Sequence, residues 1–260
     1  MSKDTSRKKN KGSGKSMSFI RLDQLVLSLG LAKDMSHAHG LILAGDVLIN
    51  DQVQDKVGIP VSPDAKVRLK EEKMPYVSRG GYKLNAAFKR WSLSVHDQIC
   101  LDLGASTGGF TDCLIQEGAQ KIYAIDAGSN QLDWRLRTHP RVISMENTNA
   151  RFWDPACIPD KIHFLCADVS FISLKKIIPP MLGSLEKDSQ AVLLIKPQFE
   201  AKREEVGEGG IVVDPRVHQR ICDELFLYFS ATKLKPREIM PSPILGPKRN
   251  QEFLMLLQYD

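Results

Sequence analysis

The chain has 260 residues, of which 42% are hydrophobic and 26% are charged. This length allows one large domain, or one large and one small domain, and the composition is typical of a globular protein. No apolar run approaches the roughly 18 residues that cross a bilayer. No apolar segment follows the basic N-terminus as it would in a secretory signal. We therefore expect no stable membrane association.

The five cysteines are scattered along the chain and never have C-x-x-C spacing. This pattern argues against a disulfide framework and against a zinc site, so we expect no metal. Cys100 and Cys166 fall inside predicted strands, where a free thiol packs as a small hydrophobic group. Unpaired thiols indicate the reducing cytoplasm.

The formal net charge of +5 comes from the N-terminal tail. Residues 1–17 hold six basic residues and one acid, whereas the remainder holds 30 of each. We expect the tail, residues 1–18, to be disordered because it is rich in Lys, Ser and Gly and has little to bury. Two interpretations stay open: a solubilising tail, and a mobile arm that contacts RNA phosphates.

Residues 19–70 predict a small module of two helices and a small sheet. Apolar residues at helical spacing predict the first helix: Leu22, Leu25, Val26 and Leu29. Gly30 ends this helix, and Ser36 is the predicted N-cap of a second helix that ends near Gly45. Extended segments follow at 47–49 and 67–69.

The order "RLDQLVLSLGLA…LILAGDVLINDQ" resembles the S4-like RNA-binding domain. This resemblance implies contacts with structured RNA through the second helix and the following hairpin, and we expect Arg21 to take part. His37 and His39 stand where the family usually has Arg or Lys. The module also has equal numbers of acids and bases, which predicts weak RNA binding by itself. Docking onto a partner protein is the alternative.

Residues 71–78 contain Met74-Pro75 and predict a linker before a second domain at 79–260. The following stretch, SRGGYKLNAAFKRW, contains no acid and predicts a helix with one apolar face. Its basic residues are free to contact RNA, and we expect this of Arg79, Lys89 and Arg90.

The second domain alternates predicted strands and helices. The expected strands are Gln98–Leu103, Lys121–Asp126, Arg141–Met145, Ile162–Asp168 and Gln190–Lys196. A helix is expected at about Pro215–Ala231, followed by extended pieces at Lys235–Met240 and Glu252–Gln258. Apolar strands separated by helices predict a parallel sheet covered on both faces, which is an α/β fold.

The stretch ICLDLGASTGGFTD predicts a ligand-binding loop. A buried strand ends at Asp102-Leu103, the chain turns at Gly104, and a helix begins near Gly108-Gly109. Glycines let the backbone pass close to a ligand, and a helix N-terminus carries a positive dipole. A ligand is therefore expected at the carboxyl ends of the strands.

Two common nucleotide loops do not fit this stretch. Ala105-Ser106 follow Gly104, so the second glycine of G-x-G-x-x-G is missing, and no Lys-Ser or Lys-Thr pair completes a phosphate loop. Asp126, about 20 residues further on, suits the ribose of a nicotinamide cofactor or of S-adenosylmethionine. The loop itself resembles the first motif of S-adenosylmethionine-dependent methyltransferases, which favours the second cofactor. The resemblance implies that Asp102 and the loop amides hold the methionine end.

Charged residues follow two further apolar strands, Asp168 in "FLCADVSFISL" and Lys196 in "AVLLIKPQFE". One such residue is often only a surface terminus. Two at the ligand-binding edge of the sheet are candidates for a functional site.

The motifs "YVSRGGYKL", "LDLGASTGGFTD", "ADVSFISL", "KPQFE" and "GEGGIVVD" together resemble the TlyA family, over roughly residues 19–258. The resemblance implies a small α+β S4-like domain followed by an FtsJ-like, Rossmann-like methyltransferase domain with a mostly parallel seven-stranded sheet. It also implies 2′-O-methylation of cytidine in ribosomal RNA, with ribosomal RNA or ribosomal subunits as partners.

The related catalytic pattern is Lys-Asp-Lys-Glu, and it matches Lys83, Asp168, Lys196 and Glu252. A ribose 2′-hydroxyl is a weak nucleophile, so its proton must leave as the oxygen attacks. We expect Lys196 to take or relay that proton and Asp168 to orient Lys196. Glu252 is expected to hold the lysines, and Lys83 to steady the ribose or an adjacent phosphate.

The cofactor site implied by the resemblance consists of strand-end and loop residues: Asp102, Gly104, Ser106, Thr107, Gly108, Gly109 and Asp126. Asn147, after the third strand, is expected at the adenine edge. A turn residue is the alternative interpretation of Asn147.

Three rival functions are weighed against this hypothesis. A cytolysin, as the family's older hemolysin label implies, needs a spanning or strongly amphipathic segment, which the sequence lacks. A non-catalytic RNA-binding assembly factor is disfavoured because all four candidate catalytic residues are present. A methyltransferase for a small molecule or a protein is disfavoured by the S4-like domain.

Overall fold

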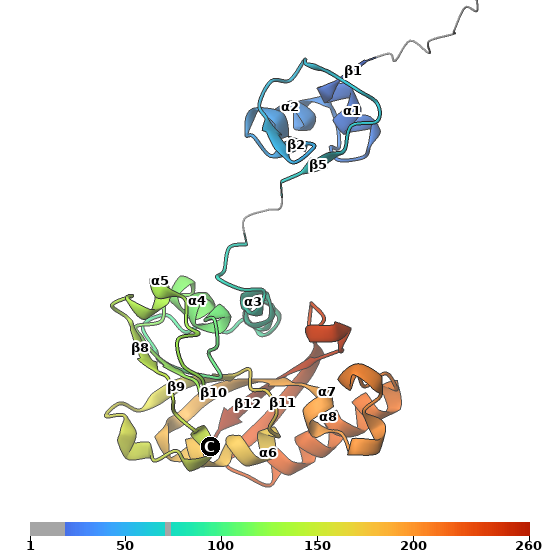
Figure 1. Ribbon diagram of the computed structural model, residues 1–260. Helices are drawn as coiled ribbons and strands as arrows, with labels where there is room; N and C mark the ends of the chain where they lie inside the picture. Colours follow the sequence, from blue (N-terminus) through green and yellow to red (C-terminus); the bar gives the residue numbers. More distant parts are fainter. Residues whose placement is uncertain (1–18, 71–73) are drawn as a thin grey trace, which may run out of the picture. The chain divides into compact units, whose positions relative to one another are not determined.

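The computed structural model describes residues 19–70 and 74–260 (Figure 1). They belong to two compact units that divide between Lys73 and Met74. The predicted tail at 1–18 and residues 71–73 of the predicted linker lie outside the described residues.

The first unit packs two helices beside short antiparallel strands. Its helices are α1 (Leu22–Ser28) and α2 (Met35–Leu43). One sheet has the order β3-β2-β5 and a two-stranded sheet pairs β1 with β4; the strands are β1 (Ile20–Arg21), β2 (Val47–Ile49), β3 (Gln52–Gln54), β4 (Pro60–Val61) and β5 (Val67–Leu69). The N-cap of α2 is Asp34 and not the predicted Ser36, because the Asp34 carboxylate accepts the backbone N–H of His37.

A buried acid joins the elements of the first unit. Asp23 is fully buried in α1 and accepts Nε and Nη2 of Arg21 at 3.1 and 2.7 Å. The Asp23 carboxylate also lies 3.1 Å from Nε2 of His39 in α2. Hydrogen bonding to the Arg21 guanidinium lowers the pKa of Asp23 to about 2. Arg21 and His39 therefore hold the fold of this unit together.

The second unit is built on a seven-stranded sheet with the order β11-β12-β10-β9-β6-β7-β8. The strands are β6 (Ile99–Leu103), β7 (Lys121–Ile125), β8 (Val142–Met145), β9 (Ile162–Ala167), β10 (Leu185–Ile195), β11 (Leu234–Pro241) and β12 (Phe253–Tyr259). All pairings are parallel except those of β12, which runs antiparallel to both neighbours. The mostly parallel sheet confirms the predicted fold class.

The strand boundaries follow the predictions with one difference. β10 begins at Leu185, five residues before the predicted start at Gln190. Its register against β9 shifts between these two residues, and Asp188 between them has a positive φ of 63°. The first residues of β10 are mostly charged or polar, so the pattern of apolar residues did not predict them as part of the strand.

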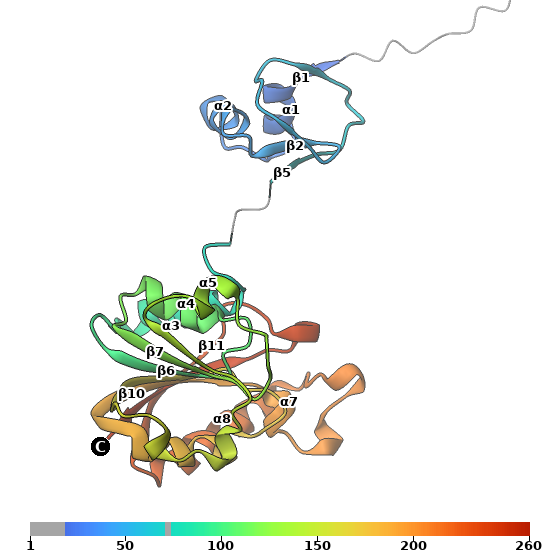
Figure 2. The ribbon, with the colours of Figure 1, turned by 60° about the vertical axis from the view of Figure 1, so that its left-hand side comes forward.

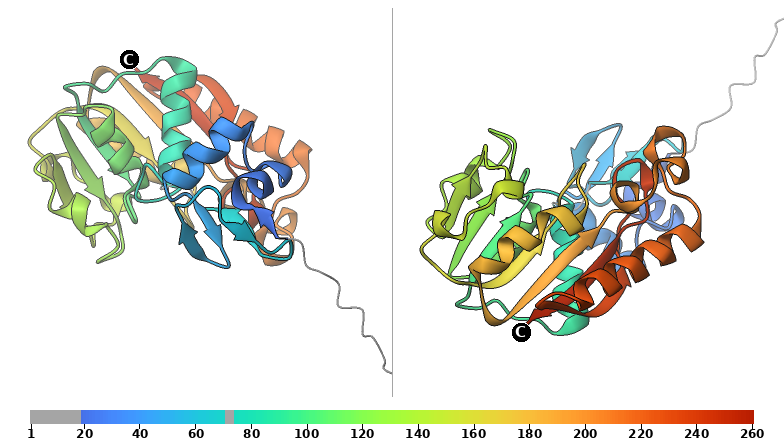
Figure 3. Two further views of the ribbon diagram at one scale, coloured as in Figure 1. Left: turned by 90° about the horizontal axis from the view of Figure 1, so that it is seen from above. Right: turned by 90° about the horizontal axis from the view of Figure 1, so that it is seen from below.

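Helices cover both faces of the sheet (Figures 1 and 2). One face carries α3 (Gly80–Trp91), α4 (Gly109–Gln116) and α5 (Trp134–Arg137), and the other carries α6 (Leu174–Ile177) and α8 (Pro215–Ser230). Figure 3 views the same unit from above and below and shows the two layers separately. Successive side chains of β6 point to opposite faces of the sheet, so the strand contributes to the hydrophobic core on each face. Cys100 packs with α3 and α4, and Leu101 packs with α8.

Residues 74–78 belong to the second unit, although the sequence assigned them to a linker. Tyr76 is buried and its ring meets Tyr82 of α3 edge-on, with 5.6 Å between ring centroids. The backbone N–H of Val77 donates to the Asp112 carboxylate in α4 at 2.8 Å. These contacts fix the start of α3, which carries Lys83.

The strand order reverses between β6 and β9. From β6 the chain proceeds outward to β7 and β8, then returns to β9 on the other side of β6. The loops after β6 and β9 therefore diverge at the carboxyl ends of the strands, which is where open α/β sheets bind ligands. The backbone N–H of Asp168 donates to Leu103 O at 2.9 Å and joins the two strand ends.

Candidate functional site

Two adjoining cavities open at this reversal point. The first, named the lysine cavity, has a volume of about 290 Å³ and is lined by Lys83, Asp168 and Lys196. The second, named the Asp126 cavity, has a volume of about 500 Å³. Gly104, Ser106, Asp168 and Ser170 line both cavities, so these residues mark their junction.

Four predicted catalytic side chains form one connected chain of charges. Lys196 Nζ lies 2.5 Å from Asp168 Oδ1, and Lys83 Nζ lies 3.9 Å from Asp168 Oδ2. Lys83 Nζ also donates to Glu252 Oε2 at 2.7 Å. The two lysines are almost buried, so the charges compensate each other in a setting with little water.

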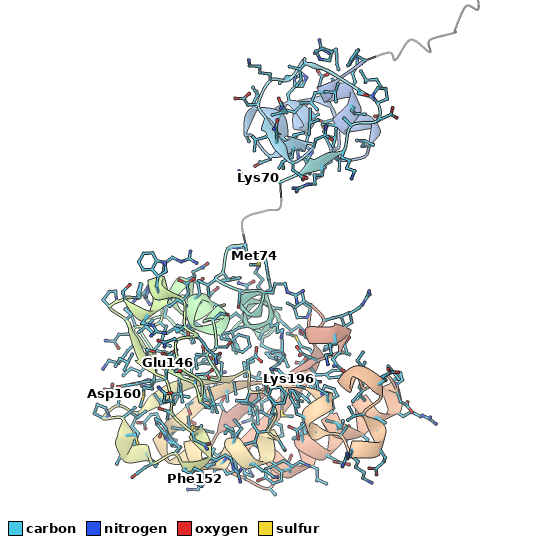
Figure 4. The ribbon with its side chains drawn as sticks, viewed as in Figure 1. Lys70, Met74, Glu146, Phe152, Asp160 and Lys196 are labelled. Atoms are coloured by element: carbon cyan, nitrogen blue, oxygen red, sulfur yellow. The ribbon has the colours of Figure 1, made fainter. Side chains whose placement is uncertain are left out.

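Each member of this group comes from a different element. Lys83 lies near the beginning of α3, and Asp168 directly follows β9. Lys196 follows β10, just before the short helix α7 (Pro197–Glu200), and Figure 4 labels it inside the second unit. Glu252 immediately precedes β12. The sheet and one helix therefore fix all four positions.

The Glu252 carboxylate is fully buried beneath the loop between β11 and β12. A Cβ atom on Gly246 would lie 2.0 Å from Glu252 Oε1, so any larger residue there would displace the Glu252 carboxylate. Asn250 ties the loop down, because its Oδ1 accepts the N–H of Val212 and its Nδ2 donates to Gly210 O, both at 3.0 Å. The loop encloses the lysine cavity with Ile244, Leu245 and Gly246.

The glycine loop after β6 is tied to Asp126 at the end of β7. Asp126 Oδ2 accepts the N–H of Ser106 at 2.8 Å, and Oδ1 accepts the N–H of Gly128 at 2.7 Å. Gly104 has a φ of 83°, and a Cβ there would lie 2.7 Å from Asp168 O. Glycine is required at this crossing of the two strand-end loops.

The Asp126 cavity combines apolar walls with a few polar groups. Ile125, Ala150 and Ile172 supply apolar surface, and the amides of Gln131 and Asn149 also line it. Each oxygen of Asp126 uses one lone pair on a backbone N–H and retains another for a ligand hydroxyl. Its size and lining are typical of a small-molecule site.

Asp102 lies beneath the glycine loop and lines neither cavity. It is fully buried, and its Oδ2 accepts the Thr111 hydroxyl at 2.6 Å, which braces β6 against α4. Desolvation raises the pKa of Asp102 to about 7. Asp102 therefore supports the glycine loop from below. That it also contacts the methionine end of the cofactor stays a prediction.

We expect the Asp102 carboxyl to make stability depend on pH. An acid whose pKa is about 7 when folded and 3.8 when unfolded stabilises the fold while protonated, and this contribution is lost as pH rises through about 7. Relative to Asp102→Asn, the wild type should lose up to about 4 kcal/mol of unfolding free energy between pH 4 and pH 8. Urea denaturation at several pH values measures this difference. The exposed Asp97→Asn variant is the control, and equal pH curves for wild type and Asp102→Asn would refute the expectation.

Comparisons with known proteins place this architecture in a family. The model of the FtsJ-like methyltransferase matches residues 76–259, and that of the S4 domain matches residues 20–67. A Bacillus subtilis protein named "Putative rRNA methyltransferase YqxC" is 43% identical over 92% of this chain and 85% of its own length. The Mycobacterium tuberculosis "16S/23S rRNA (cytidine-2'-O)-methyltransferase TlyA" is 36% identical over 92% of this chain and 89% of its own length. This chain belongs to the TlyA family of FtsJ-like methyltransferases.

A solved structure supports the same assignment. A Streptococcus thermophilus protein described as "Putative hemolysin" has a TM-score of 0.71 and 40% identity, and the match covers 94% of this chain and 90% of that one. Membership of the TlyA family confirms the resemblance seen in the sequence. Among the residues that the structure describes, no helix is long and apolar enough to cross a membrane.

Several predicted site residues lie away from the two cavities. Asn147 has a φ of 55° and lines neither cavity, whereas its neighbours Thr148 and Asn149 line the Asp126 cavity. The turn interpretation therefore fits the position of Asn147 better than the adenine edge. Gly108 starts α4 at a φ of 100° and also lines neither cavity, in contrast to Ser106, Thr107 and Gly109.

The predicted RNA-binding residues differ in their surroundings. Arg79 is exposed and lines the lysine cavity. Lys89 and Arg90 are exposed in the last turn of α3. They lie about 15 Å from Arg79 along the helix axis, at 1.5 Å per residue. Arg90 forms an ion pair with Glu238 at 2.6 Å. Arg21 is paired with Asp23. Of the three residues that belong to the second unit, Arg79 is the one that lies beside the candidate catalytic residues.

Two site residues were missed by sequence reasoning, Ser170 and Phe171. The Ser170 hydroxyl accepts Lys196 Nζ at 2.9 Å. Phe171 is 91% exposed, lines the Asp126 cavity and has a φ of 63°. Both residues closely follow Asp168 in the sequence, and this proximity to a candidate catalytic residue could have indicated them.

Proposed function

We propose that this protein transfers a methyl group from S-adenosylmethionine to the 2′-hydroxyl of a cytidine in ribosomal RNA. The observation that carries the proposal is the connected group of Lys196, Asp168, Lys83 and Glu252 at the junction of two cavities. Membership of the TlyA family supports it, as does the named activity of the M. tuberculosis relative. An RNA substrate fits the S4 domain at residues 20–67, and a ribosomal substrate implies a cytoplasmic location.

The residues present fit S-adenosylmethionine as the methyl donor. Asp126 retains acceptor capacity for the ribose hydroxyls, and the apolar walls of its cavity suit the adenine ring. The glycine loop borders both cavities, and Gly104 has no side chain to keep a ligand from its backbone. When bound, this cofactor supplies an electrophilic methyl group on a sulfonium. Asp168 and Ser170, which line both cavities, would border its reactive end.

The lysine cavity receives the acceptor ribose. The 2′-oxygen forms a bond to the methyl carbon while the carbon–sulfur bond breaks with its electrons on sulfur, and the hydroxyl proton passes to Lys196 Nζ. Lys196 performs this step as the neutral amine, since an ammonium has no lone pair to accept a proton. Holding the reacting groups in line supplies much of the remaining rate acceleration.

The other three side chains act on Lys196 or on the substrate. Asp168 contacts Lys196 through Oδ1 and faces Lys83 through Oδ2, so it orients the Lys196 amine and compensates the charge of the Lys83 ammonium. Glu252 fixes Lys83, whose ammonium is free to hold a ribose oxygen or phosphate with its remaining donors. Arg79 at the rim of the cavity attracts the RNA backbone.

Phe171 supports a nucleic-acid substrate. A bulky residue with positive φ costs about 1–3 kcal/mol, and such strain is retained where the surroundings enforce it. The exposed Phe171 ring lies 5.0 Å from the Phe199 ring, centroid to centroid, and Lys196 Nζ lies 6.0 Å from the Phe199 centroid. Phe199 thus lies between the reacting lysine and the exposed Phe171 ring, which is a surface on which an unstacked base can lie.

Replacing Phe171 with alanine is expected to weaken RNA binding. Base–aromatic stacking contributes about 1–3 kcal/mol, which corresponds to a 5- to 150-fold rise in the Kd for substrate RNA. Because Phe171 also lines the Asp126 cavity, RNA binding is measured with S-adenosylmethionine at saturation. The control is Phe152→Ala, because Phe152 is 79% exposed but lines neither cavity, and Figure 4 labels it at the lower surface of the unit. Equal RNA affinities for the two variants would exclude the stacking role.

Labelled methyl transfer tests the proposed function. Purified protein is incubated with S-adenosylmethionine labelled in the methyl group and with separately purified small and large ribosomal subunits. We expect label in ribosomal RNA with wild type, and none with Asp168→Ala. A protein that binds the cofactor yet labels no RNA would instead be an assembly factor. Release of dye from liposomes by pure protein would favour the cytolysin.

A further inference from the structure

We propose that Ser170 is a positioning residue for methyl transfer, which directs the Lys196 amine at the 2′-hydroxyl. This inference rests on the proposed function and extends it to a residue outside the four-residue catalytic pattern. Ser170 accepts Lys196 Nζ at 2.9 Å and lines both cavities, so it lies where the acceptor and the methyl donor meet.

The geometry of an amine explains why two anchors matter. A neutral lysine amine has two N–H donors and one lone pair in a tetrahedral arrangement. Ser170 Oγ accepts one of these N–H groups at 2.9 Å, and Asp168 Oδ1 lies 2.5 Å from Nζ. The lone pair is directed away from both oxygens, because each oxygen repels it. Because Lys196 lines the lysine cavity, that direction serves a hydroxyl bound there.

With Asp168 alone, the amine could rotate about its Cε–Nζ bond. Among the described residues, Ser170 is the one hydrogen-bond partner of Lys196 Nζ, so its loss frees the lone pair to turn away from the acceptor. Lys196 has no third polar partner among the residues that the structure describes, and its Nζ lies 6.0 Å from the centroid of the Phe199 ring. Ser170 therefore decides the direction of the base.

The backbone around Ser170 keeps the hydroxyl in place. The N–H of Asp168 is bonded to Leu103 O at one end of the segment, and the strained Phe171 follows Ser170 at the other. Ser173 and Leu174 are held by the Glu200 carboxylate at 2.6 and 2.8 Å. A short loop fixed on both sides can hold a side chain in one position while that side chain remains exposed to the cavities.

Substitutions of Ser170 separate this role from others. Ser170→Ala is expected to lower kcat about 10- to 100-fold, the range for a lost hydrogen bond to a charged or reacting group. Ser170→Thr restores a hydroxyl and should recover most of that rate. The Kd of S-adenosylmethionine, measured by calorimetry, and the melting temperature should both stay near the wild-type values.

A double-mutant cycle with Lys196 provides the decisive readout. If Ser170 acts through Lys196, then adding Ser170→Ala to Lys196→Ala changes the residual rate by less than about twofold. An equal loss in both backgrounds would overturn the proposal, as would a loss confined to cofactor affinity. Wild-type protein that transfers no methyl group to ribose would refute the proposed function itself, so the two failures are distinguishable.

Discussion

Lys196→Ala is expected to lower kcat for RNA methylation by about 10²–10⁴-fold, the usual contribution of a positioned general base. The variant removes the amine that takes the 2′-hydroxyl proton and leaves the two cavities open. Affinities for S-adenosylmethionine and for RNA should remain within a few fold of wild type, because Lys196 contacts Asp168 and Ser170 rather than the glycine loop. Single-turnover rates at saturating cofactor measure the chemical step.

Lys187→Ala is the matched control for this variant. Lys187 lies in the same strand, β10, but near its exposed beginning and away from both cavities. It should retain the wild-type rate. Near-normal single-turnover methylation by Lys196→Ala would show that another group accepts the proton.

Glu252→Ala is expected to lower the free energy of unfolding by about 3–5 kcal/mol, because it leaves the Lys83 ammonium buried without its carboxylate partner. Glu252 is fully buried and Lys83 is 7% exposed, so water can compensate the lost pairing only slightly. Asp168 at 3.9 Å is a poor replacement. Urea denaturation followed by tryptophan fluorescence measures the change.

Glu238→Ala provides the comparison for a surface pair. Glu238 lies in the neighbouring strand β11 and bonds Arg90 at 2.6 Å, with side chains that are 40% and 59% exposed. Its loss should cost about 0–1 kcal/mol. Equal stability of the Glu252→Ala and Glu238→Ala variants would show that burial of the Lys83–Glu252 pair does not cause the larger loss.

The fold and part of the site could be predicted from the residues themselves. Apolar strands alternate with helices, and the carboxyl ends of parallel strands meet at one edge, so Asp168 and Lys196 were expected to be neighbours. The loop at Gly104 and the acid at Asp126 follow from the same rule. The hydrogen bond between Ser106 and Asp126 shows how directly these two loops are coupled.

Other parts of the site depend on geometry that a single sequence does not express. Lys83 and Glu252 are 169 residues apart, and only the family resemblance brought them together in advance. Ser170 meets Lys196 because of the path of the loop after β9, whose positive φ at Phe171 has no counterpart in residue preferences. The turn at Asn147 likewise decides that Asn149 lines the cavity instead.

The position of the transferred methyl group tests the central claim most directly. RNA methylated by the wild-type protein is digested to nucleosides, and the labelled nucleoside is identified by mass spectrometry. The account predicts one modified nucleoside, 2′-O-methylcytidine, which is absent after treatment with Lys196→Ala. Label on a base, or on a protein instead of RNA, would contradict the account, because the lysine cavity would then serve a different acceptor.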